Sequence, residues 1–139
     1  MLMPVPAGCS MVEAAAMPEA FAAAYLNLFR EGGLQPGNTL LMQAGASGLS
    51  SVVIPMAKVV GARVITTIID EQKRTAVAAT GADIIVNTAE ESLEAVLQQL
   101  AEGHPVDIAI DCLGGAGMGG CLPYLAHGAL DHDCRPGRP

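Results

Sequence analysis

The segment that most constrains the fold is an apolar run followed by a glycine turn and a longer apolar stretch. Residues 39–44 are Thr-Leu-Leu-Met-Gln-Ala, residues 45–48 are Gly-Ala-Ser-Gly, and residues 49–61 run from leucine to glycine. This order predicts a buried strand, a tight turn and a helix. Residues 62–69, Ala-Arg-Val-Ile-Thr-Thr-Ile-Ile, predict a second strand. The segment therefore closes a βαβ unit.

The turn is the part of this unit that suits a ligand. Glycine lets the backbone bend sharply and come close to a bound molecule, and the first turn of a helix presents unpaired N–H groups to an anion. A dinucleotide pyrophosphate is the ligand that such a turn most often holds. A purely structural loop is the alternative interpretation. We predict cofactor contacts from Gly45, Ala46, Ser47, Gly48 and Leu49.

Composition and charge narrow the class of protein. The chain has 139 residues, 51% of them hydrophobic, and its formal net charge is −7. The apolar content is typical of parallel strands covered by helices. The negative charge argues against nucleic acid and anionic membrane as partners. No apolar run is long enough to span a bilayer, and we see no secretory signal, so we expect a cytoplasmic protein.

The sequence contains no clear motif for metal binding or for nucleophilic catalysis. The four cysteines are far apart in the sequence, with no Cys-x-x-Cys and no histidine at ligand spacing: Cys9, Cys112, Cys121 and Cys134. We therefore predict no metal site. Cys112 ends an apolar run and fits a small buried side chain better than a nucleophile. No catalytic residue is assigned.

The segment ahead of the βαβ unit predicts a helix. Ser10 and Glu13 form a capping-box pattern that starts it, Pro18 should interrupt it, and residues 19–31 should resume it with Tyr25 on a core-facing side. Residues 1–38 as a whole are expected to lead into the domain.

The rest of the chain alternates between helices and strands. Helices are predicted over residues 70–80 and 90–102, and strands over residues 83–87 and 106–112. Such alternation predicts a Rossmann-type parallel sheet with helices on both faces, about four strands and the order 3-2-1-4. The ligand would lie over strands one and four, where Leu113 and Gly114 face the first glycine turn.

Five stretches resemble the medium-chain dehydrogenase/reductase superfamily. They are Pro-Glu-Ala-Phe-Ala-Ala-Ala-Tyr-Leu-Asn-Leu-Phe (18–29), Gly-Ala-Ser-Gly (45–48), Gly-Ala-Arg-Val-Ile (61–65), Gly-Ala-Asp-Ile-Ile-Val-Asn (81–87) and Asp-Ile-Ala-Ile-Asp-Cys-Leu-Gly-Gly (107–115). The zinc-free NADPH:quinone oxidoreductases are the most similar branch, because Glu19 stands near the position of a metal-binding cysteine in the zinc-dependent branch. The resemblance implies NADP(H) as cofactor and hydride transfer to a small-molecule acceptor, a quinone or an enone.

The same resemblance bears on cofactor preference. Folds that prefer NAD carry an acid at the end of the second strand, and Ile68 occupies that position. Lys73 stands where quinone oxidoreductases often carry a lysine for the 2′-phosphate, although a solvated helix residue is the alternative interpretation. Asp70 and Glu71 would repel a phosphate. We expect weak binding that prefers NADPH to NADH.

The chain also departs from the family pattern. Ser50 replaces the third glycine of the turn, so we expect the helix to pack less closely on the strand. The domain is expected over residues 39–128, with residues 129–139 as a disordered tail, and no substrate domain precedes it. The fourth strand would then be an exposed edge that favours self-association. We expect no appreciable quinone reduction by this polypeptide alone.

Three alternatives stay open at this stage. The chain is part of an oxidoreductase, a non-catalytic nucleotide-binding or interaction module, or another doubly wound domain that binds a mononucleotide. A lost base near Gly128 would also explain the tail, because a neighbouring frame can encode Arg-Trp-Ile in place of residues 129–131. Sequencing the gene tests that hypothesis.

Overall fold

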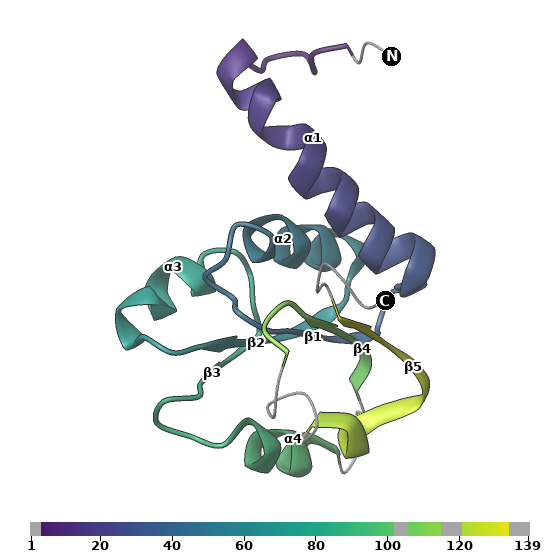
Figure 1. The fold of residues 1–139 in the computed structure, drawn as a ribbon, viewed down its shortest axis with the longest axis vertical. Coiled ribbons are helices and arrows are strands. Elements are labelled where there is room, and N and C mark those ends of the chain that lie inside the picture. The colour runs from purple at the N-terminus through teal and green to yellow at the C-terminus, as the bar shows by residue number, and fades with distance from the viewer. Residues whose placement is uncertain (1–3, 102–105, 115–120, 134–139) are drawn as a thin grey trace.

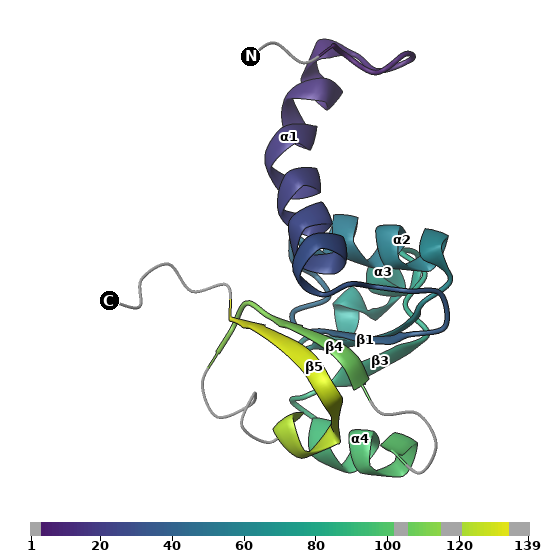
Figure 2. The same cartoon turned by 90° about the vertical axis from the view of Figure 1, so that its right-hand side faces the viewer.

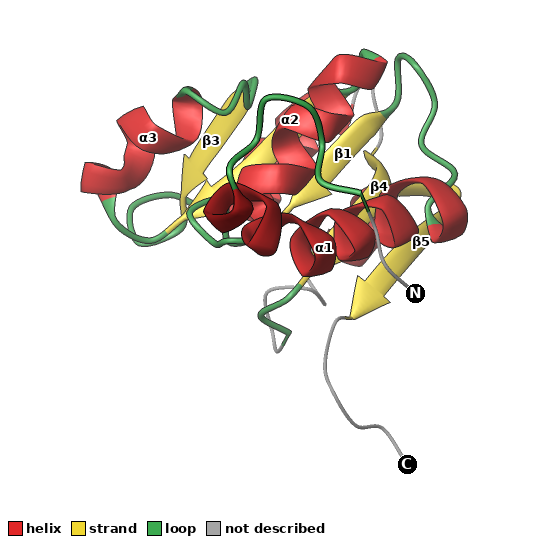
Figure 3. Ribbon diagram, turned by 90° about the horizontal axis from the view of Figure 1, so that it is seen from above, coloured by secondary structure: helices red, strands yellow, loops and turns green. Residues whose placement is uncertain are grey.

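The structure is a computed structural model that describes residues 4–101, 106–114 and 121–133. A parallel five-stranded sheet lies between helices (Figure 1). The strands are β1 (Thr39–Met42), β2 (Arg63–Ile68), β3 (Ile84–Asn87), β4 (Val106–Asp111) and β5 (Leu125–Asp133). Their order is β3-β2-β1-β4-β5, which Figure 3 shows from above. The predicted Rossmann-type fold and the order of the first four strands are confirmed.

Helices cover both faces of this sheet. They are α1 (Met11–Tyr25), the π-helix η1 (Leu26–Glu31), α2 (Ser50–Val60), the 3₁₀-helix η2 (Glu71–Lys73), α3 (Arg74–Ala78), α4 (Leu93–Ala101) and the 3₁₀-helix η3 (Leu122–Tyr124). Figure 2 shows α1, α2 and α3 on one face and α4 on the other. Because all the strands run parallel, the loops that follow them gather at one edge of the sheet, the carboxyl edge.

The fifth strand corrects the expectation that the sheet ends at β4. Residues 129–133, expected in a disordered tail, belong to β5, which runs parallel to β4 with Leu130 opposite Ile108. An edge strand offers unpaired N–H and C=O groups to any extended segment, so the pairing does not need apolar alternation. β4 is thus not the exposed edge from which self-association was expected. Residues 134–139 lie outside the described residues.

The first helix confirms one prediction and corrects two. The Ser10 hydroxyl accepts a hydrogen bond from the Glu13 N–H, and the Glu13 carboxylate accepts one from the Ser10 N–H, as a capping box requires. The expected interruption at Pro18 is wrong, because α1 continues through it. A proline ring fixes φ near the helical value and removes only one N–H. Tyr25 is 54% exposed rather than in the core, and its ring packs against Phe29.

Two apolar cores lie on opposite faces of the sheet. The core below α1 and α2 contains Ala24, Leu28, Leu34, Leu40, Met42, Val53, Ile54, Ala57, Ala62, Val64, Ile108 and Ile110. The core on the α4 side contains Leu41, Ile65, Val86, Leu97, Val106, Ala109 and Cys121. Adjacent residues of β1 alternate between the two cores, as a strand covered on both faces requires. The sheet is therefore a rigid platform for the loops at its carboxyl edge.

An ion pair joins α2 to the start of β3. Lys58 Nζ lies 2.7 Å from Asp83 Oδ2 and also donates to the Ala62 carbonyl at 3.0 Å. The Val64 N–H donates to the same carboxylate oxygen at 2.7 Å. Burial raises the pKa of Asp83, but the hydrogen bonds from Lys58 and Val64 outweigh it and leave the pKa below its ordinary value.

This lowered pKa predicts a pH-dependent contribution to stability. A carboxyl group whose pKa is lower in the folded protein stabilises it above the unfolded pKa of about 3.9, and this contribution is lost as pH falls through the folded value. We expect wild type to be more stable than Asp83→Asn at pH 7, with the difference shrinking below about pH 4. Urea unfolding of both proteins across that range measures it. A difference that stays constant down to the lowest pH would contradict the assignment.

Candidate dinucleotide-binding site

The turn between β1 and α2 is built around two serine hydroxyls. Ser47 Oγ accepts from the Ser50 N–H at 3.1 Å and lies 2.8 Å from Ser50 Oγ. The Ser50 hydroxyl donates to the Ala44 carbonyl at 2.7 Å, and this side chain is fully buried. A glycine could not make this bond. Ser50 therefore fastens α2 to the end of β1, and the looser packing expected at this position is not observed.

Backbone amides at this turn are open to a ligand. The N–H groups of Ala46, Gly48 and Leu49 donate no hydrogen bond to any residue that the structure describes. A Cβ placed on Gly48 would meet no atom within 4 Å, so the space beside it is free. The positive end of the α2 dipole adds to these donors. Unpaired amides beside open space at a helix N-terminus fit the phosphates of a dinucleotide.

Two threonines of β2 contact the turn and its flanking residue Ala44. A Cβ on Gly45 would lie 2.4 Å from Thr66 Oγ1, so only glycine fits against this side chain. Ala44 adopts a positive φ of 56°, which is uncommon for a residue with a Cβ. Its N–H donates to Thr67 Oγ1 at 3.0 Å, and the Gly45 N–H donates to the Thr67 carbonyl at 2.7 Å. Thr66 and Thr67 thus fix the shape of the turn.

The loop after β4 lies at the same edge of the sheet. The Asp111 carboxylate, 1% exposed, accepts from the Leu113 N–H at 2.8 Å and from the Gly114 N–H at 3.0 Å. Gly114 has a φ of 64°, a conformation that favours glycine. β4 pairs directly with β1. The structure therefore brings Leu113 and Gly114 to the carboxyl edge that also holds the first turn, as the sequence predicted.

Gln43 and Cys112 lie between these two loops. Cys112 Sγ is 3.8 Å from the Gln43 carbonyl. Burial, and then the charge of Asp111, raise the pKa of the Cys112 thiol, so this group is protonated at neutral pH and a poor nucleophile. The Gln43 amide nitrogen is buried and has no hydrogen-bond partner among the residues that the structure describes. Among described side chains, no group of three or more His, Cys, Asp or Glu could hold a metal ion.

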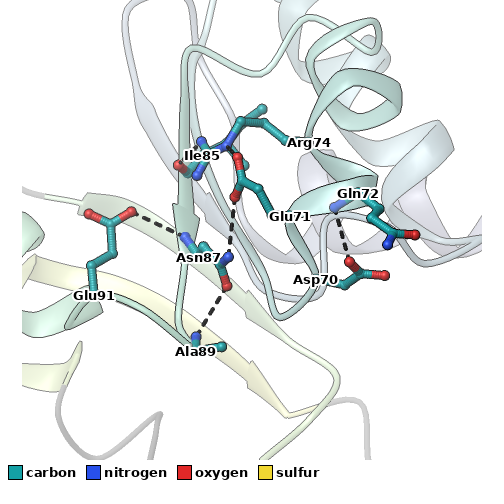
Figure 4. Close-up of polar contacts among 8 residues, drawn as sticks. All are labelled: Asp70, Glu71, Gln72, Arg74, Ile85, Asn87, Ala89 and Glu91. Atoms are coloured by element: carbon teal, nitrogen blue, oxygen red, sulfur yellow. Dashed lines mark hydrogen bonds and ion pairs between the residues drawn. The ribbon is translucent and has the colours of Figure 1, made fainter.

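The third part of the site follows β2. Lys73 ends η2 and is exposed. Asp70 caps η2 by accepting from the Gln72 N–H at 2.9 Å, and Glu71 pairs with Arg74 (Figure 4). β2 is the neighbour of β1 on the side opposite to β4. All predicted contact residues therefore lie after β1, β2 and β4, three adjacent strands, at one edge.

Sequence reasoning missed the residues that shape these loops. The sequence pattern predicts Thr66 and Thr67 only as part of a strand, and Asp111 only as part of an apolar run. A signal was present, because two adjacent hydroxyl side chains and a carboxylate stand inside otherwise apolar strands. Buried polar groups need hydrogen-bond partners, and the neighbouring turns supply them here.

A comparison with protein families decides the assignment. The family model described as zinc-binding dehydrogenase matches residues 48–130, which include α2, the strands β2, β3 and β4, the first part of β5 and the loop at Leu113. The chain belongs to the zinc-binding dehydrogenase family. The resemblance to medium-chain dehydrogenases and reductases of the quinone oxidoreductase-like branch is confirmed.

Several members of this dehydrogenase family are similar over most of the chain. A quinone oxidoreductase-like protein 2 homolog from Nematostella vectensis is 33% identical over 127 residues, which are 90% of this chain and 34% of that protein. The structure of quinone oxidoreductase from Escherichia coli in complex with NADPH gives a TM-score of 0.83 at 28% identity, over 91% of this chain and 39% of that one.

A second similar structure is that of an enzyme described as NAD-dependent. An NAD-dependent alcohol dehydrogenase gives a TM-score of 0.82 at 33% identity, over 93% of this chain and 38% of that chain. The chain thus spans between a third and two fifths of these three relatives. No helix in the described part of this dehydrogenase family member is long and apolar enough to cross a membrane.

Proposed function

We propose that this chain binds NADP(H) and is the cofactor-binding part of an oxidoreductase that transfers hydride to a small-molecule acceptor, a quinone or an enone. The observation that carries the proposal is the turn at residues 45–49, with its unpaired amides beside open space. Similarity to a quinone oxidoreductase solved with NADPH supports the choice of cofactor. A cytoplasmic location and self-association stay part of the proposal, and light scattering tests the second.

Each loop has a role in this proposal. The amides of Ala46, Gly48 and Leu49 would hold the pyrophosphate at the start of α2. Leu113 and Gly114 would line the opposite side of the crevice, and Lys73 would contact the 2′-phosphate. When bound, NADPH supplies the hydride. The protein's part is to hold the cofactor in place and to orient it, so no catalytic residue is assigned.

Calorimetric titration with NADPH and NADH tests this function. We expect weak binding with a preference for NADPH, and Lys73→Ala should remove the preference while NADH binding is retained. Arg63→Ala is the matched control, because it removes one positive charge from the opposite end of β2. If neither NADPH nor NADH binds, the proposed function is wrong. NADH binding as tight as NADPH binding would refute the preference alone.

A further inference from the structure

A hydrogen-bonded network joins the loop after β2 to the end of β3. Arg74 Nε donates to Glu71 Oε1, and Arg74 Nη1 donates to the Ile85 carbonyl at 2.8 Å. The other Glu71 oxygen accepts from Asn87 Nδ2 at 3.2 Å. Figure 4 shows the Arg74 and Glu71 side chains meeting beside β3. The guanidinium group is thereby held between the Glu71 carboxylate and the backbone of β3.

The buried end of the network restrains Glu71. Asn87 is only 2% exposed. Its N–H donates to the Glu91 carboxylate and its Oδ1 accepts from the Ala89 N–H, both at 3.2 Å. The bond to Glu91 holds the Asn87 backbone, and the bond from Ala89 holds the side-chain oxygen, so that Nδ2 of the same amide faces Glu71. A carboxylate held by a fixed amide keeps its own partner, Arg74, in one position.

This network lies at the part of the site that distinguishes the two cofactors. In dinucleotide folds, the residues after the second strand meet the ribose 2′ position, which carries a hydroxyl in NADH and a phosphate in NADPH. β2 ends at Ile68, and the segment from Asp70 to Arg74 follows it at once. Lys73 makes no ion pair with any described residue, whereas Arg74 makes one. Only one of the two neighbouring cations is therefore available to a phosphate.

We propose that Glu71 limits the preference for NADPH by holding Arg74 away from the 2′-phosphate; this inference rests on the proposed function. A guanidinium group is the strongest side-chain partner for a phosphate, because its planar fork makes two parallel hydrogen bonds. Arg74 reaches a phosphate only by leaving Glu71. The carboxylate then stays at the site and repels the incoming charge. In the wild type, Lys73 alone contacts the 2′-phosphate, and this contact accounts for the modest preference for NADPH over NADH.

Removing the charge of Glu71 tests the proposal. We expect Glu71→Gln to raise the ratio of NADPH to NADH affinity about tenfold, because Arg74 gains a charge-assisted hydrogen bond to the phosphate. The gain should disappear in the double variant Glu71→Gln/Arg74→Ala. Calorimetry with both nucleotides on full-length chains measures the ratio, and thermal unfolding checks that each variant is folded.

Glu90→Gln is the matched control. Glu90 lies close enough to raise the pKa of Arg74, although the hydrogen bond that Arg74 donates to Glu71 is the largest cause of that rise. Its side chain accepts no hydrogen bond from a described residue. This variant removes the same charge without releasing Arg74, so we expect the affinity ratio to change less than threefold. An equal gain in both variants would show a general charge effect and overturn the proposal, as would a gain that survives the loss of Arg74.

A second single variant covers the case in which Glu71→Gln does not fold. If Arg74 is held away from the phosphate, Arg74→Ala removes no contact with it and only leaves the Glu71 carboxylate without its ion-pair partner, so the affinity ratio should fall by less than about threefold. A tenfold fall would show that Arg74 already contacts the phosphate, and the proposal would be wrong. Wild-type protein that binds NADPH but fails these tests refutes only the role of Glu71. Wild-type protein that binds neither nucleotide refutes the proposed function itself.

Discussion

Replacing Gly45 with alanine lowers the free energy of unfolding by about 3 kcal/mol. The added Cβ would lie 2.4 Å from Thr66 Oγ1 and 2.9 Å from Thr66 Cγ2. Thr66 is fully buried, and its hydroxyl donates to the Met42 carbonyl at 2.6 Å. The side chain therefore cannot turn away without losing that bond and disturbing the core between β1 and β2. Urea unfolding monitored by circular dichroism measures the change.

A second substitution, Thr66→Ala, separates the steric clash between the added Cβ at residue 45 and Thr66 from other effects of the alanine. Thr66→Ala removes the two atoms that come closest, so Gly45→Ala should destabilise a Thr66→Ala background far less than it destabilises wild type. Gly48→Ala is the positional control, because no atom lies within 4 Å of its Cβ. A Gly45→Ala variant as stable as wild type would mean that β2 can move away from the turn.

Gly48→Ala should weaken NADPH binding at least about 100-fold while leaving stability within about 0.5 kcal/mol of wild type. The methyl group would enter the space beside the unpaired amides of Ala46, Gly48 and Leu49. A pyrophosphate pushed away from this backbone loses charge-assisted hydrogen bonds to two or more of those amides. Calorimetry gives the affinity, and the same preparation in urea unfolding gives the stability.

Comparing the Gly45→Ala and Gly48→Ala variants tests the assignment of the turn directly. The two residues stand three positions apart in one turn, yet the structure predicts a stability defect for one and a binding defect for the other. NADPH binding by Gly48→Ala within threefold of wild type would show that the phosphates do not approach this turn. The site would then have to be sought elsewhere along the carboxyl edge of the sheet.

The order of β1 to β4 could be predicted from sequence because each strand is an apolar run separated from the next by a helical segment. Such alternation leaves few arrangements for a parallel sheet. The glycine turn could be predicted for the same reason, since its position between a strand and a helix is a local property. The capping box at Ser10 is equally local, and the structure contains both of its hydrogen bonds.

The features that sequence reasoning missed all depend on distant partners. β5 forms on the open backbone edge of β4, whereas its sequence has no alternating strand pattern. The fit of Gly45 against Thr66 joins residues 21 positions apart, and the pairing of Glu71 with Asn87 joins residues 16 positions apart. Helix α1 continues past Pro18 although propensity argues for a break, because propensity is a weak prior once a chain is in its folded surroundings.

The strand order also affects how the chain folds as it leaves the ribosome. β1 is the middle strand, and one of its partners, β4, is far along the chain: the Thr39 N–H donates to Asp107, 68 residues later. Until that segment has been synthesised, a strand that is entirely buried in the finished fold has one side without a partner. Contacts of such long sequence separation slow folding and expose strand edges in the meantime. Synthesis past residue 111, the end of β4, is therefore the step after which the centre of the sheet is protected from pairing with other nascent chains.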